Sequence, residues 1–327
     1  MRATSANTGT SSSIAAASTA SIATTSLNSG SSTRAMTAKF PISCEYDQLS
    51  NVPGKYGGTR KESQPEKETP RVRRPKRPYA ELRAASAFSF LDGASLPEDL
   101  IYQAAQQDVP AMALVDTNGV YGAPRFYGAA KKAGLKALVG AELILESGGR
   151  ATALVENRTG YKNLCKLITA GAATREKGKA RFTWELIEQY AEGLHCLTRD
   201  DDATVGKIAG IFKGRTHVEL QRHSIREEEH HNQRLIALAR TLKLPLVATN
   251  GIRYARDEDK PLHDVLTCIR EGRNLDTAGR LLGVNRQRHI KGAAEMLALF
   301  KDIPEAVSNA WELSQCLTFT LANLGYQ

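Results

Sequence analysis

Short apolar runs alternate with segments of helical periodicity from Tyr79 onward, and this alternation restricts the folds open to the chain. Strands separated by helices need crossover connections, so we expect an α/β fold with a mainly parallel sheet, and seven strands favour a barrel. The apolar runs predict strands over residues 79–84, 111–116, 136–141, 151–155, 194–198, 216–220 and 245–249. Helices are predicted over residues 97–107, 122–133, 161–172, 184–190, 204–212 and 227–242.

The pattern after Tyr254 is helical only. Helices are predicted over residues 260–271, 277–282, 293–300 and 304–317. We therefore divide the folded part into a barrel over residues 79–256 and a helical extension over residues 257–327 that packs against it.

Residues 1–78 have a different composition from the rest of the chain. The first 35 are almost wholly Ser, Thr, Ala, Asn and Gly, which bury too little apolar surface to offset the entropy of ordering, so we expect disorder. A targeting peptide, or a true start at Met36, are the alternatives. This segment carries twelve basic and five acidic residues, which is most of the net charge of +9, so the charge does not indicate a nucleic-acid-binding barrel.

A basic run closes this segment, between Pro70 and Pro78. A solvated linker is the simpler interpretation, because no aromatic residue is interleaved for base stacking. The alternative is binding of DNA phosphates by counterion release. The phosphate-binding candidates are Arg71, Arg73, Arg74, Lys76 and Arg77.

Cysteine and hydropathy patterns indicate the compartment. The five cysteines are far apart and form no Cys-x-x-Cys pair, so neither a disulfide framework nor a zinc knuckle is predicted. No apolar run reaches the roughly 18 residues of a membrane span. We expect a soluble cytoplasmic protein with no membrane contact.

Polar residues follow several of the predicted strands. In parallel α/β barrels the loops at the carboxyl ends of strands carry the chemistry. Asp116, Glu142 and Asn250 lie at such ends, and Asp92 lies in the loop after the first strand. The carboxylates of Asp92, Asp116 and Glu142 are therefore candidate ligands of a divalent cation, with turn formation and helix capping as the alternative interpretation.

Histidines restrict which metal such a site can hold. All seven lie beyond position 194, so the first half of the barrel offers no imidazole to a transition metal. His217 and Glu219 alternate on one predicted strand and share a face, so they could form a pair, but a strand histidine satisfied by other neighbours is the favoured interpretation. His230 and His231 are expected in solvent.

Several segments in order resemble the N-terminal PHP (polymerase and histidinol phosphatase) domain of bacterial DNA polymerase III alpha subunits. They are YAELRAASAFSFLDGAS from Tyr79, ALVDTNGVYGAPRFYGAAKKAG from Ala113, VGAELIL from Val139 and LVENRTGYKNLCKLIT from Leu154. THVELQRH, LPLVATNGIRYA, PLHDVLTCIREG and LANLGYQ resemble the error-prone, damage-tolerant paralogue in particular. The resemblance covers roughly residues 79–327 and implies a distorted seven-stranded (βα) barrel.

The resemblance also implies that the metal site of the family is degenerate here. Its opening His-x-His pair matches Arg83 and Ala85, a later position that is often His matches Thr117, and its closing Asp-x-His motif matches Gly251 and Arg253. Asp92, Asp116 and Glu142 match retained acidic positions. Arg83 and Arg253 are expected to pair with these carboxylates in place of metal cations.

Three functions remain open at this point. The preferred one is a non-catalytic PHP module of an error-prone polymerase III alpha-like protein, without a cofactor, that contacts a polymerase core or accessory replication and repair proteins. The second is a phosphoesterase or 3'-5' exonuclease that uses Mg²⁺, Mn²⁺ or Zn²⁺ on the remaining carboxylates. The third is a DNA-binding module, and deletion of residues 1–78 would abolish binding only under this last hypothesis. The polymerase domains of the family are absent from this sequence.

Overall fold

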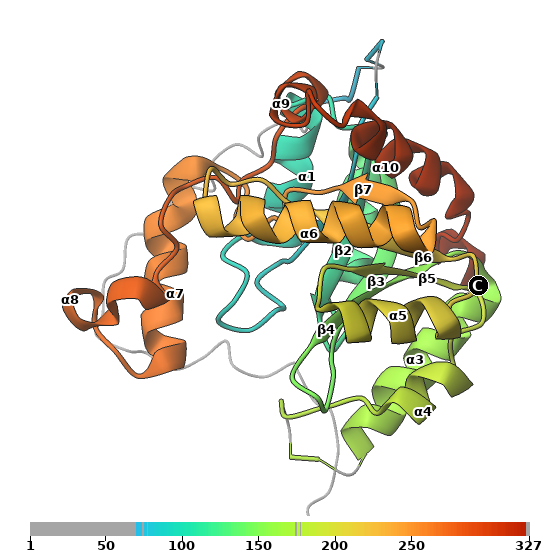
Figure 1. Ribbon diagram of the computed structural model, residues 1–327. Helices are drawn as coiled ribbons and strands as arrows, with labels where there is room; N and C mark the ends of the chain where they lie inside the picture. The colour runs from blue at the N-terminus through green and yellow to red at the C-terminus, as the bar shows by residue number, and fades with distance from the viewer. Residues whose placement is uncertain (1–69, 74, 77, 174, 177, 325–327) are drawn as a thin grey trace, which may run out of the picture. The chain divides into compact units, whose positions relative to one another are not determined.

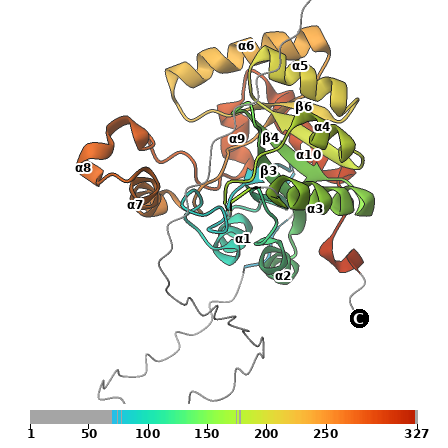
Figure 2. The same ribbon diagram turned by 90° about the horizontal axis from the view of Figure 1, so that it is seen from below.

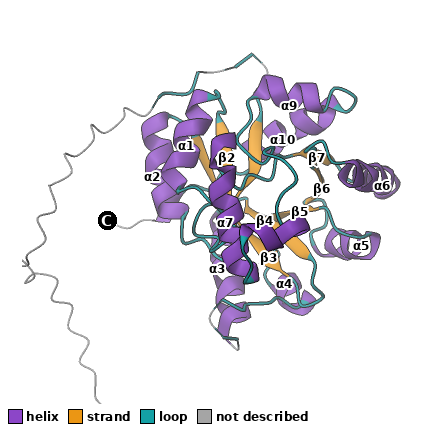
Figure 3. Ribbon diagram, turned by 90° about the vertical axis from the view of Figure 1, so that its left-hand side faces the viewer, coloured by secondary structure: helices purple, strands orange, loops and turns teal. Residues whose placement is uncertain are grey.

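Seven strands form one sheet in chain order in the computed structural model, which describes residues 70–73, 75–76, 78–173, 175–176 and 178–324. The sheet curls and helices surround it (Figure 3), so the predicted α/β fold with a distorted seven-stranded barrel is confirmed. The strands are β1 (Ala80–Ala84), β2 (Ala111–Thr117), β3 (Lys136–Ile144), β4 (Arg150–Val155), β5 (Leu194–Thr198), β6 (Thr216–Leu220) and β7 (Leu246–Ala248).

Strand β4 runs antiparallel to both of its neighbours, while the other pairs are parallel. The prediction of a mainly parallel sheet holds, but the sequence did not indicate this reversed strand. The connection from Ile144 to Arg150 is too short for a crossover helix, so β3 and β4 form a hairpin. Gly148, at a φ of +93°, makes its turn.

The first and last strands meet at a seam with little strand pairing. One isolated bridge joins Ala84 to Ile252, where the backbone N–H of Ala85 donates to the Ile252 carbonyl at 3.0 Å. Helix α10 (Pro304–Cys316) packs against both β1 and β7 along the rest of the seam. Leu82, Val247 and Ala310 belong to one apolar cluster there. Packing against α10 therefore replaces the ladder of hydrogen bonds that would otherwise join β1 to β7.

Helices enclose the sheet on its outer side (Figures 1 and 2). Those of the barrel are α1 (Pro97–Gln106), α2 (Ala123–Ala133), α3 (Arg158–Ala173), α4 (Trp184–Gln189), α5 (Asp202–Ile211) and α6 (Arg226–Leu242). The bounds of these helices agree with the predicted ranges to within three residues, because the apolar periodicity of each segment stops near residues that typically begin or end a helix. In α2, Pro124 lies in the first turn and Gly134 ends the helix in the left-handed conformation.

The remaining helices follow β7. They are α7 (Lys260–Glu271), α8 (Leu275–Ala278), α9 (Ala293–Leu299) and α10, with 3-10 turns over Asp257–Asp259, Gly279–Leu281 and Leu321–Leu324. The helix predicted over residues 277–282 begins two residues earlier as α8 and continues as a 3-10 turn from Gly279, whose φ is +49°. In Figure 1, α7 and α8 lie to one side of the sheet, next to the β1–α1 loop.

No helix in the described part of the chain is long and apolar enough to cross a membrane. The leader over residues 1–35 and most of the linker lie outside the described residues. The backbone N–H of Val72 donates to Ala133 at 3.2 Å, which attaches the described end of the linker to α2. The divisions of the chain at residues 78 and 256 stay predictions.

Candidate functional site

Arg83 joins two buried carboxylates inside the barrel. It lies on β1, and its guanidinium donates to Glu219 of β6 at 2.5 Å and to Glu142 of β3. All three side chains are at least nine-tenths buried, so each charge depends on the others for compensation. Burial opposes the charge of Arg83, but Glu219 and Glu142 outweigh it and raise the pKa of the guanidinium further.

Glu142 is shared among three arginines. One carboxylate oxygen accepts from Arg83 and the other from Arg150 at 2.5 Å, and the second oxygen also lies 3.8 Å from Arg253. Burial alone would raise the pKa of Glu142, but Arg83, Arg253 and Arg150 outweigh it and lower the pKa to about 2. Glu142 is therefore a carboxylate that the protein itself neutralises.

Asp92 lies in the β1–α1 loop between Arg253 and a further arginine, Arg270. Its carboxylate oxygens lie 3.5 Å from Nε of Arg253 and 3.3 Å from Arg270 of α7. Burial acts to raise the pKa of Asp92, but Arg253 and its basic neighbours lower it overall. Arg253 thus lies between Asp92 and Glu142, and links two of the three acidic residues that the sequence singled out.

Asp116 of β2 has a different environment. It accepts from the backbone N–H of Ser86 at 2.8 Å, from the Ser86 hydroxyl at 3.0 Å and from the Ser89 hydroxyl at 2.8 Å. Burial raises its pKa in spite of these donors. Asp116 therefore holds the β1–α1 loop through Ser86 and Ser89.

The other positions matched to the family motif have main-chain roles. Ala85 forms part of the seam with Ile252, and the backbone N–H of Thr117 donates to the Ser89 hydroxyl at 3.0 Å. Gly251 has a φ of +54°, and a Cβ built there would lie 2.6 Å from Nε2 of Gln221. A residue with a side chain does not fit at Gly251 without displacement.

The three candidate metal ligands all have partners within the protein. Both carboxylate oxygens of Asp92, Glu142 and Asp116 contact an arginine or a hydrogen-bond donor of the protein. Within the described ranges, no three or more His, Cys, Asp or Glu side chains are grouped so that they could hold a metal. The metal-ligand assignment of Asp92, Asp116 and Glu142 stays a prediction.

Another buried carboxylate, Glu81, lies on β1 beside the seam. It accepts from the Tyr79 hydroxyl at 2.9 Å, the backbone N–H of Arg83 at 2.8 Å and the backbone N–H of Asn250 at 2.9 Å. Burial raises the pKa of Glu81 to about 7 against these donors. Sequence reasoning missed Glu81, although the alternation that points Arg83 inward also places residue 81 on that face.

His217 does not pair with Glu219. His217 contacts His195 of β5, with 3.1 Å between their ring nitrogens, whereas the ion-pair partner of Glu219 is Arg83. Burial and His195 lower the pKa of His217 to about 4. His231 was expected in solvent, but it lies against the carbonyl oxygen of Arg199 at 2.7 Å and is half-buried.

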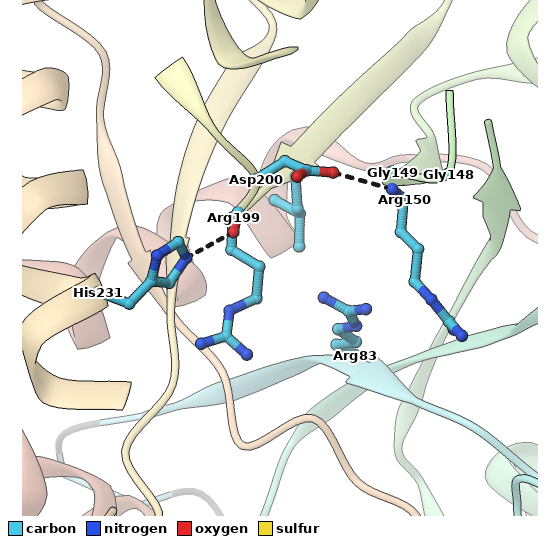
Figure 4. A pocket seen from close by; sticks show the side chains of 8 residues that line it. Arg83, Gly148, Gly149, Arg150, Arg199, Asp200 and His231 are labelled. Atoms are coloured by element: carbon cyan, nitrogen blue, oxygen red, sulfur yellow. Dashed lines mark hydrogen bonds between the residues drawn. The ribbon is translucent and has the colours of Figure 1, made fainter. Parts of the chain in front are cut away.

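A cavity of about 390 Å³ opens beside Arg83 (Figure 4). Arg150 begins β4, and Arg199 follows β5, so two strand ends direct arginines toward the same opening as Arg83. Arg199 donates to Gln221 at 2.9 Å and lies 3.5 Å from Glu228. Sequence reasoning missed Arg150 and Arg199, which belong to no motif. The lining is Arg83, Gly148, Gly149, Arg150, Leu197, Arg199, Asp200 and His231.

The basic run is only partly described. Arg71, Arg73 and Lys76 are exposed, and the backbone N–H of Arg73 donates to Asp108 at 2.9 Å. Arg74 and Arg77 lie outside the described residues. The phosphate-binding role of the run stays a prediction.

Comparisons with known proteins agree with this fold. Residues 81–243 match the family model described as PHP domain. The chain is 36% identical over 262 residues to the error-prone DNA polymerase of Anaeromyxobacter dehalogenans, and 32% identical over 260 residues to DNA polymerase III subunit alpha of Pseudomonas aeruginosa. These matches cover 75% and 72% of this chain but only 23% and 22% of the relatives, so the chain spans less than a quarter of their length.

Solved structures are more distant. A two-domain protein from Bacteroides vulgatus, described as containing a PHP-like metal-dependent phosphoesterase, aligns with a TM-score of 0.39 and 12% identity over 71% of this chain and 73% of that one. An amidohydrolase from Chromobacterium violaceum, solved with bound sulfate and no metal, aligns with a TM-score of 0.40 and 14% identity over 54% of this chain and 87% of that one.

Proposed function

Because residues 81–243 belong to the PHP domain family, we propose that the chain is a PHP module of an error-prone DNA polymerase system that does not hydrolyse phosphoesters. Its barrel then acts as a structural and binding element in DNA replication and repair. The observation that carries this proposal is the buried Arg83 guanidinium between Glu142 and Glu219.

The arginine side chains around Glu142 act against metal binding at this carboxylate. A divalent cation at Glu142 would have to displace Arg83 or Arg150 from the carboxylate, or lie beside them against charge repulsion. Displacing Arg83 would also leave Glu219 buried without its partner, and breaking a buried ion pair costs about 3–5 kcal/mol. Water activation by a metal needs an open coordination position, and three arginines lie around Glu142 where such a metal would bind.

The partner that we propose is a polymerase core or an accessory protein of replication and repair. This rests on the relatives, which are named as polymerases and extend far beyond the region matched here. A module without its own chemistry contributes by holding such a partner in place.

The test is elemental analysis of the purified full chain, paired with hydrolysis of single-stranded DNA and a chromogenic phosphodiester in added Mn²⁺ and Zn²⁺. We expect substoichiometric metal and no turnover above buffer. Stoichiometric metal, with turnover that Glu142→Gln and Asp116→Asn abolish, would overturn the proposal and establish a carboxylate-based phosphoesterase. Glu305→Gln, on the exposed side of α10, is the matched control. If a contaminating nuclease causes the turnover, all three variants will retain it.

Binding to the partner needs a separate measurement. The full chain is titrated against a purified polymerase core that lacks its own PHP region, and the complex is detected by sedimentation. A defined complex that survives removal of metal by EDTA supports a scaffold, whereas its absence with the core and with accessory repair proteins would refute that role.

A further inference from the structure

Helix α7 presents a row of apolar side chains to solvent. Leu262, Val265 and Ile269 are 51%, 41% and 60% exposed. They are spaced by three and then four residues, so they lie along one side of the helix, and we call this row the α7 stripe. The segment after α7 exposes more large apolar side chains, which are Leu275, Leu281 and Val284. Apolar side chains gathered in this way are typical of a binding surface.

The opposite side of α7 is attached to the barrel. Cys268 is buried, and the ring of His263 lies 5.7 Å from the ring of Tyr254. Arg270 also donates to the carbonyl oxygen of Leu91 at 3.1 Å. Figures 1 and 2 show α7 and α8 on the side of the barrel away from α3 and α4. Because these contacts fix the helix, the α7 stripe faces outward and needs a partner from outside the barrel.

Opposite charges flank the two ends of the α7 stripe. Glu258 lies four residues before Leu262, and its side chain is 77% exposed. The Glu258 carboxylate is 3.9 Å from Nε of Arg256, which is a loose surface contact that leaves it available to a further cation. Arg273 lies four residues after Ile269 and is exposed as well. The stripe therefore begins at an anion and ends at a cation.

The pattern of the α7 stripe is complementary to its own reverse. Leu262 and Ile269 are equally far along the chain from a midpoint directly after Val265. Glu258 and Arg273 are equally far from the same midpoint. A two-fold axis through this point places each member of a pair against the other member on a second copy, and every contact then occurs twice. A parallel arrangement would instead oppose like charges, which disfavours association.

We propose that the α7 stripe is the interface of a homodimer, in which α7 packs antiparallel to α7 of a second copy of this chain. Charge complementarity identifies the occupant, because one chain carries both halves of each apolar contact and both halves of each ion pair. The inference goes beyond the proposed function, and it does not depend on whether the barrel binds a metal.

The test is sedimentation velocity of the full chain between about 0.1 and 100 µM. We expect a reversible monomer–dimer equilibrium. Ile269→Asp should weaken it by about tenfold or more, because it places an unpaired charge in the centre of the interface. Leu242→Asp is the matched control, since Leu242 is an exposed apolar residue at the end of α6 and its replacement should leave the equilibrium unchanged. Thermal unfolding of each variant checks that the fold is retained.

Exchange of charges tests the pairing of Glu258 with Arg273. Glu258→Arg and Arg273→Glu each bring like charges together at both ends of the interface, so each should weaken dimerisation by about tenfold or more. The double variant Glu258→Arg/Arg273→Glu restores both ion pairs, and we expect it to regain the affinity of the wild type. A double variant as weak as the single ones would contradict this pairing.

Cross-linking tests the antiparallel direction. Chains carrying Leu262→Cys and Ile269→Cys are mixed and oxidised, and the disulfides are mapped by mass spectrometry of the peptides. We expect a link between residues 262 and 269. Neither chain alone should link its new cysteine to itself, because about 10 Å of helix then separates the two positions and a disulfide cannot span it. A link from residue 269 to residue 269 would show parallel packing and overturn the arrangement.

Two results would refute the homodimer. The first is a chain that stays monomeric at every concentration, and the second is a dimer that Ile269→Asp leaves unchanged. If the chain is monomeric and Ile269→Asp abolishes binding to the polymerase core, the α7 stripe belongs to that partner and not to a second copy. All of these results leave the non-catalytic function standing, because that function is tested by metal content and turnover.

Discussion

Glu81 and Asn250 connect β1 to the segment after β7, where the carboxylate of Glu81 accepts the backbone N–H of Asn250 at 2.9 Å. This contact is one of the few hydrogen bonds across a seam that is otherwise covered by α10. An ionisable group at the seam makes the joining of the two strands sensitive to proton concentration.

The pH dependence of stability follows from the pKa of Glu81, which rises from 4.5 to about 7 on folding. The folded state then binds the proton more tightly, so the free energy of unfolding falls as pH rises from about 4.5 to about 7, and is flat above. The contribution is on the order of 3 kcal/mol. Urea unfolding across this range should show that Glu81→Gln removes this part of the pH dependence. The same slope in Glu81→Gln and the wild type would show that another group is responsible.

Loss of Arg83 should be strongly destabilising. Arg83→Met leaves Glu219 and Glu142 buried without their shared partner, and we expect a loss of about 3–5 kcal/mol in urea unfolding. Adding Glu219→Gln should recover part of this loss, because it removes one unpaired charge. Arg125→Gln is the control, since Arg125 pairs with Glu98 on the surface and its loss should leave stability nearly unchanged. A comparable small change for both arginines would contradict the assigned role of Arg83.

Restoring the histidines of the family motif should not restore a metal site. In the variant Arg83→His/Ala85→His, one Glu142 oxygen loses its partner, but the other still contacts Arg150 and lies near Arg253, and these positive charges oppose a bound cation. We expect no stoichiometric zinc after dialysis, measured by elemental analysis. Tight one-to-one zinc binding with unchanged stability would show that the pocket keeps the ligand geometry of the metal-binding family members.

Gly251 should not tolerate a side chain. Gly251→Ala combines a φ of +54° with a contact to Gln221, and we expect a loss of more than about 1 kcal/mol in the free energy of unfolding. Gly210→Ala in α5 is the matched control, because a Cβ there meets nothing within 4 Å and the exposed helix should gain about 1 kcal/mol. Unfolding curves in which both variants shift the same way would refute this assignment.

The sequence predicted the strands well because each is a short apolar run bounded by turn residues. It did not predict the direction of β4, because the composition of an apolar run does not report strand direction. Connection length does not settle it either, since β4 and β5 are antiparallel although helices α3 and α4 lie between them. Gly279 ends α8 early for a local reason, a left-handed backbone, that periodicity does not report.

The site was harder to predict than the fold. Alternation along β6 places His217 and Glu219 on one face, but it does not tell which strand lies opposite, and the residue opposite Glu219 is Arg83. The resemblance to a family drew attention to Arg83 and Arg253, because they stand where histidines are expected. Arg150 and Arg199 have no such signal, and only the closed sheet brings them to the same cavity.

The helix over the seam has a consequence for how the protein is made. On the ribosome β1 is synthesised before the rest of the barrel, and α10, which covers its outer face at Leu82, comes long after β7. Until α10 has left the ribosome, the nascent chain holds a set of strands whose two edges are not joined. Unpaired strand edges of this kind bind chaperones or one another. The barrel is therefore most prone to aggregation while it is being synthesised.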